Sequence, residues 1–117
     1  MTGISVMTIA AGRDAHLHNL LAGLAAQSRP PDECIIAFMQ RTPYDLGSLP
    51  DLPFPVHQIR VDAPEPDALP LARARNRAAL AAAGDRLVFL DVDCIPHPEL
   101  IADYARALDG SAAPFGR

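Results

Sequence analysis

The stretch LVFLDVDC, residues 87–94, contains four apolar residues that run directly into Asp91, Val92 and Asp93. A short apolar run of this kind predicts a buried strand, here over residues 87–92. Strand side chains alternate between the two faces of a sheet, so the spacing predicts that Asp91 and Asp93 point to the same side. Two carboxylates at the end of such a strand are therefore candidate ligand-binding residues.

Strand and helix patterns alternate along the rest of the chain. Strands are expected at 4–10, 34–39 and 56–61, and helices at 15–27, 71–83 and 98–108. Leucines at 17, 20, 21 and 24 form the apolar face of the first helix, Asp14 is its candidate cap, and Gly84 is expected to end the second. Seven of the 12 prolines lie from Pro43 to Pro70, which denies regular structure to most of that span. This order predicts an α/β fold with a Rossmann-like, mostly parallel sheet and flanking helices.

Composition limits the function classes. The chain has 117 residues, enough for one domain over residues 1–117. Its formal net charge of -4 and its few aromatic residues argue against nucleic-acid binding. Cys34 and Cys94 fit small residues of a reduced protein better than a disulfide framework. No signal peptide is indicated and no apolar run approaches the about 20 residues of a membrane span, so we expect a cytoplasmic protein.

The position of the two aspartates favours a metal and phosphate site. In open parallel sheets the ligand lies beyond the carboxyl ends of the strands, where strand order reverses. Two close carboxylates repel each other unless a cation neutralises them, and oxygen ligands suit Mg²⁺ or Mn²⁺. The alternative is that Asp93 caps the following turn and Asp91 is solvated at the strand end.

Arginines in the alanine-rich helix offer a second candidate. On a helical wheel Leu71, Arg75, Ala78 and Ala82 share one face, whereas Arg73, Arg77 and Leu80 lie on the opposite one. We therefore expect Arg75 to face the sheet and to pair with an anion, either a ligand phosphate or a carboxylate such as Asp91.

The segments ISVMTIAAGR and LARARNRAALAAAGDRLVFLDVDC resemble the nucleotide-binding half of inverting family 2 glycosyltransferases with the GT-A fold. That family has a first strand that enters a nucleotide loop, then an "ARN" helix, then an "FLD-x-D" strand end. The similarity extends in order and spacing over nearly the whole chain. It implies a glycosyltransferase that uses a nucleotide diphosphate sugar as donor and a divalent metal, Mn²⁺ or Mg²⁺, as cofactor.

The resemblance also implies roles for individual residues. Asp93 matches the metal ligand and Asp91 the position nearer the donor ribose, with both counted as candidate metal and nucleotide-sugar ligands. The remaining candidate nucleotide-sugar-binding residues are Ala10, Ala11 and Arg13 of the first loop, Gln40 after the second strand, and Arg75. The acceptor, whether glycan, lipid or small molecule, is not indicated, and peripheral membrane association of a longer protein stays open.

Three departures from the family pattern matter. The first strand continues into Ile9-Ala10-Ala11-Gly12 in place of the usual Pro-Thr-Tyr-Asn-like loop. Met39-Gln40 stands where an aspartate usually reads the base, although Gln40 has the atoms to bond a base edge. The acceptor-binding half and its general base would follow Arg117, so we expect the donor-binding half alone, inactive by itself.

Two other functions compete with this interpretation. The first is a non-catalytic nucleotide-sugar-binding module, because no base is identified. The second is a phosphotransferase that uses D-x-D as nucleophile and acid. That chemistry places the motif after the first strand of its fold, whereas here three strands are expected to precede it.

Overall fold

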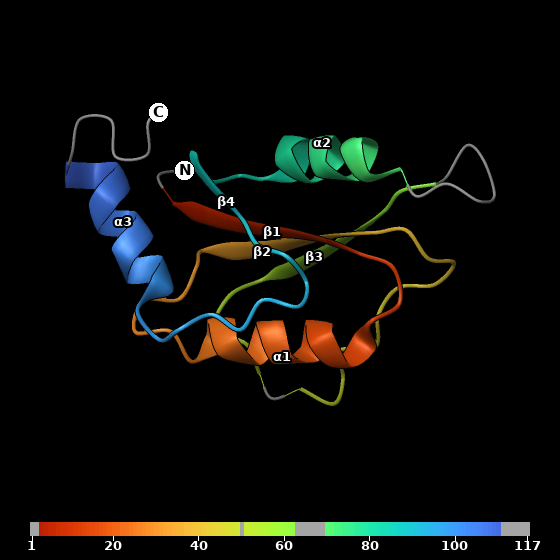
Figure 1. Ribbon diagram of the computed structural model, residues 1–117, viewed down its shortest axis with the longest axis horizontal. Helices are drawn as coiled ribbons and strands as arrows, with labels where there is room; N and C mark the ends of the chain where they lie inside the picture. Colours follow the sequence, from red (N-terminus) through yellow and green to blue (C-terminus); the bar gives the residue numbers. More distant parts are fainter. Residues whose placement is uncertain (1–2, 50, 63–69, 111–117) are drawn as a thin grey trace.

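The computed structural model describes residues 3–49, 51–62 and 70–110. Its strands and helices follow in the order β1 (Ile4–Ala10), α1 (Asp14–Ala25), β2 (Glu33–Phe38), β3 (Val56–Arg60), α2 (Leu71–Ala81), β4 (Arg86–Phe89) and α3 (Leu100–Gly110). All strand pairs are parallel, and the sheet order is β3-β2-β1-β4. Helices α1 and α2 cover opposite faces of this sheet, and α3 lies at one end of it (Figure 1). The predicted α/β fold is confirmed.

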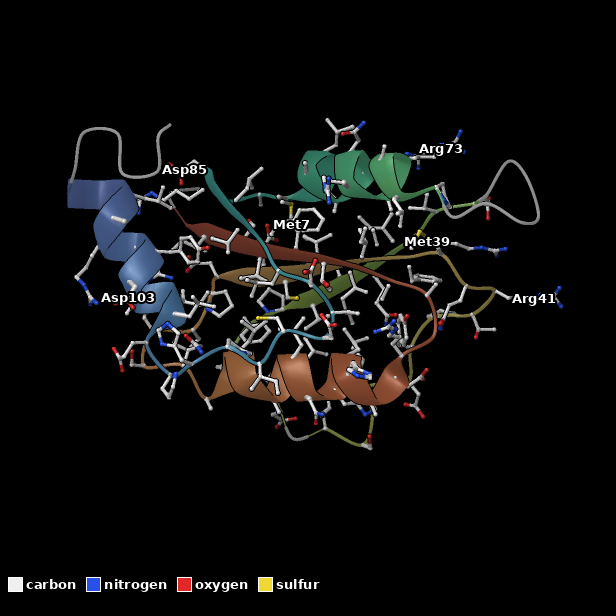
Figure 2. All side chains as sticks on the ribbon, in the orientation of Figure 1. Met7, Met39, Arg41, Arg73, Asp85 and Asp103 are labelled. Atoms are coloured by element: carbon white, nitrogen blue, oxygen red, sulfur yellow. The ribbon has the colours of Figure 1, made fainter. Side chains whose placement is uncertain are left out.

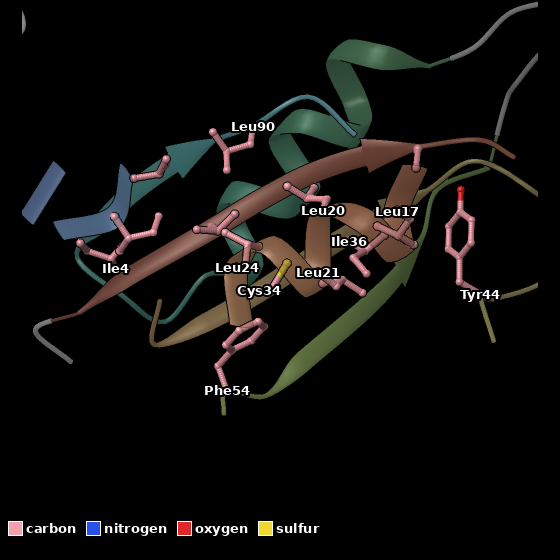
Figure 3. Close-up of a cluster of buried hydrophobic side chains, with 14 of the residues drawn as sticks. Ile4, Leu17, Leu20, Leu21, Leu24, Cys34, Ile36, Tyr44, Phe54 and Leu90 are labelled. Carbon is pink, nitrogen blue, oxygen red and sulfur yellow. The ribbon is translucent and has the colours of Figure 1, made fainter. Parts of the chain in front are cut away.

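The larger part of the core lies between the sheet and α1. The four leucines predicted to face inward, Leu17, Leu20, Leu21 and Leu24, are all completely buried. They pack against β1 and β2 side chains that share their face of the sheet, among them Ile4, Cys34 and Ile36 (Figure 3). Tyr44 and Phe54 join this cluster from the segment between β2 and β3, so that irregular connection also covers the α1 face. Burial of this apolar area is the main source of stability.

The face covered by α2 has a smaller core. Ala74 and Ala78, one helical turn apart, are the buried residues of α2, and they pack with Met7, Ile35 and Ala37. The prediction that Arg75 faces the sheet is therefore wrong, because the buried face is centred one residue earlier. Small alanine side chains let the helix backbone approach the strands closely, and a guanidinium would not fit between them.

Most boundaries differ from the predicted ones, and three of these differences concern β4, α2 and α3. The ladder of β4 ends at Phe89, before the aspartates, although the apolar run continues to Leu90. Helix α2 ends at Ala81, with Ala82 already extended, and α3 begins at Leu100 after a turn at Pro98. Gly84 is predicted to end α2, but the helix stops three residues earlier. Instead, Gly84 allows the chain to pass close to β1, since a Cβ there would lie 2.6 Å from Ser5 Oγ.

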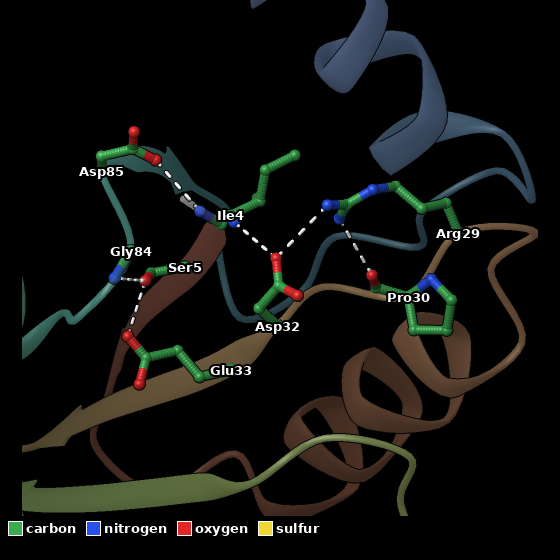
Figure 4. Close-up of polar contacts among 9 residues, drawn as sticks. Ile4, Ser5, Arg29, Pro30, Asp32, Glu33, Gly84 and Asp85 are labelled. Atoms are coloured by element: carbon green, nitrogen blue, oxygen red, sulfur yellow. Dashed lines mark hydrogen bonds and ion pairs between the residues drawn. The ribbon is translucent and has the colours of Figure 1, made fainter. Parts of the chain in front are cut away.

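A buried carboxylate ties the elements together near the amino ends of the strands. Glu33, 4% exposed, accepts hydrogen bonds from Ser5 Oγ at 2.6 Å and from the Ala83 N–H. Ser5 Oγ also accepts from the Gly84 N–H at 2.9 Å, which joins the α2–β4 connection to β1 and β2 (Figure 4). Beside it, Asp32 accepts a 2.7 Å hydrogen bond from the Ile4 N–H, at the start of β1.

These contacts determine the protonation of Glu33. Burial by itself raises the pKa of this carboxyl. The hydrogen bonds from Ser5 and from the Ala83 and Gly84 backbone, together with the nearby His57 ring, lower the pKa by more than burial raises it. The net pKa lies below the ordinary value of 4.5. Hydrogen bonds to the ionised form therefore outweigh desolvation.

We predict that Glu33→Ala lowers the free energy of unfolding by about 2–3 kcal/mol, because it leaves buried donors without an acceptor. Asp51→Ala, at an exposed loop position, is the control and should change it by less than about 0.5 kcal/mol. Urea denaturation at neutral pH measures both changes, and equal losses would contradict the role given to Glu33.

The same residue predicts a pH dependence. Because the folded state lowers the pKa of Glu33, its contribution to stability is complete above the ordinary pKa of 4.5 and is lost as the pH falls through the lower folded-state value. Denaturation midpoints measured from pH 7 to pH 3 should therefore fall less steeply for Glu33→Gln than for the wild-type chain. Parallel curves would show that the folded state does not favour the ionised form.

Candidate functional site

The strand order creates a switch point between β1 and β4. The chain goes from β1 outward to β2 and β3, and then returns to the other side of β1 for β4. All four strands are parallel, so the segments that follow them gather at one edge of the sheet. We call residues 10–13, 39–44 and 90–94 at this edge the carboxyl edge. It is the place where open parallel sheets bind ligands.

The loop after β1 has an unusual backbone that other side chains hold in place. Gly12 and Arg13 both have positive φ, 66° and 60°, and Arg13 occupies the N-cap position of α1 expected for Asp14. The Gly12 N–H donates to Gln40 Oε1 at 2.7 Å, and Tyr44 Oη donates to the Gly12 carbonyl at 2.7 Å. Two side chains from beyond β2 therefore preform this loop.

Gln40 and Tyr44 are themselves fixed. Gln40 Nε2 donates to the Thr42 carbonyl at 2.7 Å, so both polar atoms of its side chain have protein partners. The Gln58 side chain accepts from the Tyr44 N–H and donates to the Tyr44 carbonyl. Burial, and then the Asp14 carboxylate, raise the pKa of Tyr44 to about 12, so its hydroxyl stays protonated as a donor at neutral pH. In this structure Gln40 thus supports the loop, and bonding to a base edge would require it to exchange partners.

Asp91 and Asp93 belong to a turn instead of a strand. The Cys94 N–H donates to the Asp91 carbonyl at 2.9 Å, which closes the turn from Asp91 to Cys94. The predicted strand over residues 87–92 is therefore wrong at its end, because β4 stops at Phe89. Strand alternation does not apply to the two aspartates. Both carboxylates nevertheless act on the same neighbouring side chain, the Cys94 thiol. Burial raises the pKa of the half-buried Cys94 thiol, and the charges of Asp91 and Asp93 raise it further.

The structure brings together one pair of predicted site residues across the switch point. Arg13 Nη1, from the loop after β1, lies 4.0 Å from Asp93 Oδ2, from the turn after β4. The two side chains are 55% and 57% exposed, so solvent and ligands can reach both. The pair joins the loop predicted to contact the nucleotide and the residue predicted to bind the metal.

We call the turn from Asp91 to Cys94 the acidic turn. The segment after it returns along α1 to α3 (Figure 1). Pro96 lies against Gly23 so closely that a Cβ at Gly23 would come within 2.9 Å of the proline ring. Gln27, buried at the end of α1, donates to the His97 carbonyl at 2.7 Å and accepts from the Ile101 N–H at 3.0 Å. Contacts with α1 and with Gln27 at its end therefore hold the segment that follows the acidic turn.

The other predicted site residues take separate positions. Ala10 is buried, and its carbonyl accepts from the Met39 N–H, whereas Ala11 is partly exposed beside it. Arg75 is exposed, and its guanidinium carbon lies 4.8 Å from the centroid of the Phe89 ring, a cation–π contact. None of the ion pairs between described residues joins Arg75 to Asp91 or Asp93. Tyr44, Gln58 and Gln27 carry no motif and were missed, because their roles arise from contacts distant in sequence.

The two carboxylates of the acidic turn suit a hard divalent cation whose other ligands are water and substrate phosphate. Within the part of the chain that the structure describes, no group of three or more His, Cys, Asp and Glu side chains converges on one point. Asp91 and Asp93 therefore offer two exposed carboxylates and leave other positions open. Mg²⁺ and Mn²⁺ accept such sites, since they retain waters and bind substrate phosphates.

Comparison with known proteins identifies the family. The model of the family described as "Glycosyl transferase family 2" matches residues 5–113. The chain belongs to glycosyl transferase family 2. The expectation drawn from the first loop, the helix α2 and the acidic turn is confirmed at this level. No curated protein sequence matches significantly. The acidic turn follows the fourth strand, which also argues against the phosphotransferase interpretation.

Solved structures support the fold. The crystal structure of S. aureus TarS 1-349 superimposes with a TM-score of 0.63 at 24% identity, and the match covers 93% of this chain and 32% of that one. The crystal structure of S. aureus TarS gives a TM-score of 0.63 at 23% identity, over 93% of this chain and 20% of that one. The chain therefore spans about a third or less of the length of these proteins. No helix within residues 3–49, 51–62 and 70–110 has the length and apolar character needed to cross a membrane.

We predict that Arg75→Ala lowers the free energy of unfolding by about 0.5–1 kcal/mol, the usual contribution of an exposed cation–π contact. Arg77→Ala, exposed on the same helix, is the control and should stay within about 0.5 kcal/mol of wild type. Denaturant titration of both variants, with Phe89→Leu as a second way to remove the ring, tests the contact. A loss of several kcal/mol for Arg75→Ala would indicate a buried ion pair instead.

Proposed function

We propose that this chain is the donor-binding part of a glycosyltransferase that takes its sugar from a nucleotide diphosphate sugar. The observation that carries the proposal is the D-x-D turn of a family 2 chain, placed at the strand switch point beside the preformed loop that follows β1. Coverage of 93% of this chain against 32% of TarS 1-349 supports the interpretation as one part of a longer enzyme. A cytoplasmic location fits the two free cysteines.

Each side of the switch point would contribute a different function. Asp93 and Asp91 would hold Mn²⁺ or Mg²⁺, and the metal would neutralise charge on the leaving diphosphate. The loop from Ala10 to Arg13 would lie along the nucleotide, with its shape maintained by Gln40 and Tyr44. Because those contacts exist before any ligand binds, less ordering entropy would be lost on binding.

Arg75 has a less direct place in this proposal. Its guanidinium stacks on Phe89, the last residue of β4, just before the acidic turn. The charge is exposed and at the carboxyl end of a site strand, where a diphosphate would be attracted to it. We propose a role in binding the donor, without any pairing to a protein carboxylate.

We assign no general base among the described residues. Inversion at a sugar carbon needs a base close to the acceptor hydroxyl, and Asp91 and Asp93 would be occupied by the metal. Asp103 lies in α3, near the opposite end of the molecule from Arg41 of the carboxyl edge (Figure 2). The acceptor and the base would belong to other parts of the enzyme.

Metal-dependent binding of nucleoside diphosphates tests this function. Calorimetric titration with UDP, GDP and ADP should give binding to at least one in the presence of Mn²⁺, with loss of affinity when the metal is chelated. Asp93→Asn should weaken that binding about tenfold or more, as expected when a metal ligand is removed.

Asp103→Asn provides the control for this experiment. It removes the same charge from an exposed site at the far end of the molecule, and affinity should stay unchanged. Binding that is equally strong with and without metal, or equally weakened in both variants, would refute a metal site at Asp93.

A further inference from the structure

The contact between Arg13 and Asp93 has a property that the family match does not provide. Its two atoms are 4.0 Å apart, and no hydrogen bond between the side chains accompanies it. Exposed pairs of this kind contribute little to stability, so they separate easily. At 4.0 Å from Asp93, the positive charge of Arg13 still repels a second cation that approaches the Asp93 carboxylate.

The backbone directs Arg13 to this position. A residue other than glycine at φ 60° is uncommon, and here the conformation follows another positive φ at Gly12. The Gly12 N–H and carbonyl are held by Gln40 and Tyr44, so the loop cannot easily relax and carry Arg13 away. The Arg13 backbone is therefore held within reach of Asp93 by contacts that do not involve Asp93.

We propose that Arg13 is the resident counter-ion of Asp93, which a divalent metal must displace and which then pairs with the diphosphate of the donor. The proposal rests on the metal and donor site proposed above. It implies that metal alone binds weakly, because Arg13 neutralises the carboxylate that the metal needs. When metal and diphosphate arrive together, the anionic phosphates offer Arg13 a new partner, so both bind better than either would alone.

Removing the charge of Arg13 should therefore change two affinities in opposite directions. Arg13→Gln should bind Mn²⁺ alone about three to ten times more tightly than wild type at low ionic strength. With Mn²⁺ at saturation, the same variant should bind UDP, GDP or ADP about threefold or more weakly, since one charge-assisted phosphate contact is lost. The gain in Mn²⁺ affinity should shrink in 1 M salt, where charges are screened beyond about 3 Å.

Two matched variants separate this effect from a general change of charge or loop structure. Arg106→Gln removes one positive charge from an exposed side chain of α3, outside the carboxyl edge. It should behave like wild type in both titrations. Arg13→Lys keeps the charge and should restore weak Mn²⁺ binding, which a merely structural role for Arg13 would not predict.

The experiment consists of Mn²⁺ titrations followed by electron paramagnetic resonance of the free ion, then nucleoside diphosphate titrations by calorimetry. Tighter Mn²⁺ binding by Arg13→Gln alone, together with weaker diphosphate binding, supports the proposal. If Asp93→Asn abolishes Mn²⁺ binding but Arg13→Gln matches Arg106→Gln, the metal site stands and the counter-ion role is overturned. If neither wild type nor Arg13→Gln binds Mn²⁺, the proposed metal site fails and this proposal fails with it.

Discussion

The parallel pairing of β1 with both β2 and β4 is the constraint on which the rest of the structure depends. Because β1 is bonded on both sides, the loop that follows it lies between the segments that follow its two neighbours. That arrangement brings Gln40 to one side of Gly12 and Asp93 to the other side of Arg13. The contacts of Gly12 with Gln40 and of Arg13 with Asp93 are thus consequences of strand order.

The two ends of the sheet use charge in opposite ways. Near the amino ends, Glu33 is buried and satisfied by donors from β1 and the α2–β4 connection, so its charge holds the structure together. At the carboxyl edge, the charges of Arg13 and Asp93 face solvent and are only loosely paired. A buried network resists change because leaving any member unpaired is costly, whereas exposed charges can exchange partners. The amino ends of the strands therefore hold a fixed buried charge, whereas the carboxyl edge holds exposed charges that can exchange partners.

Sequence patterns predicted the strands, the buried leucines of α1 and the family, because each depends on local periodicity or on motifs contiguous in the chain. They failed for Arg75, since alanine lies all round α2 and no wheel could choose its buried face. They also misplaced the end of β4, because the apolar run continues through Leu90 into the turn. The pairing of Arg13 with Asp93 and the support from Tyr44 depend on strand order, which no local pattern encodes.

The hydroxyl of Tyr44 has a practical consequence. The chain has no tryptophan and two tyrosines, so its intrinsic fluorescence comes from tyrosine alone. One of these two rings lies edge-on to Phe38 and is bonded through its hydroxyl to the loop that would contact the nucleotide. Emission from a tyrosine depends on the acceptor bound to its hydroxyl, so the protein has a built-in optical reporter of that loop. Replacing Tyr104 with phenylalanine would leave Tyr44 as the single source of the signal, without attaching any dye.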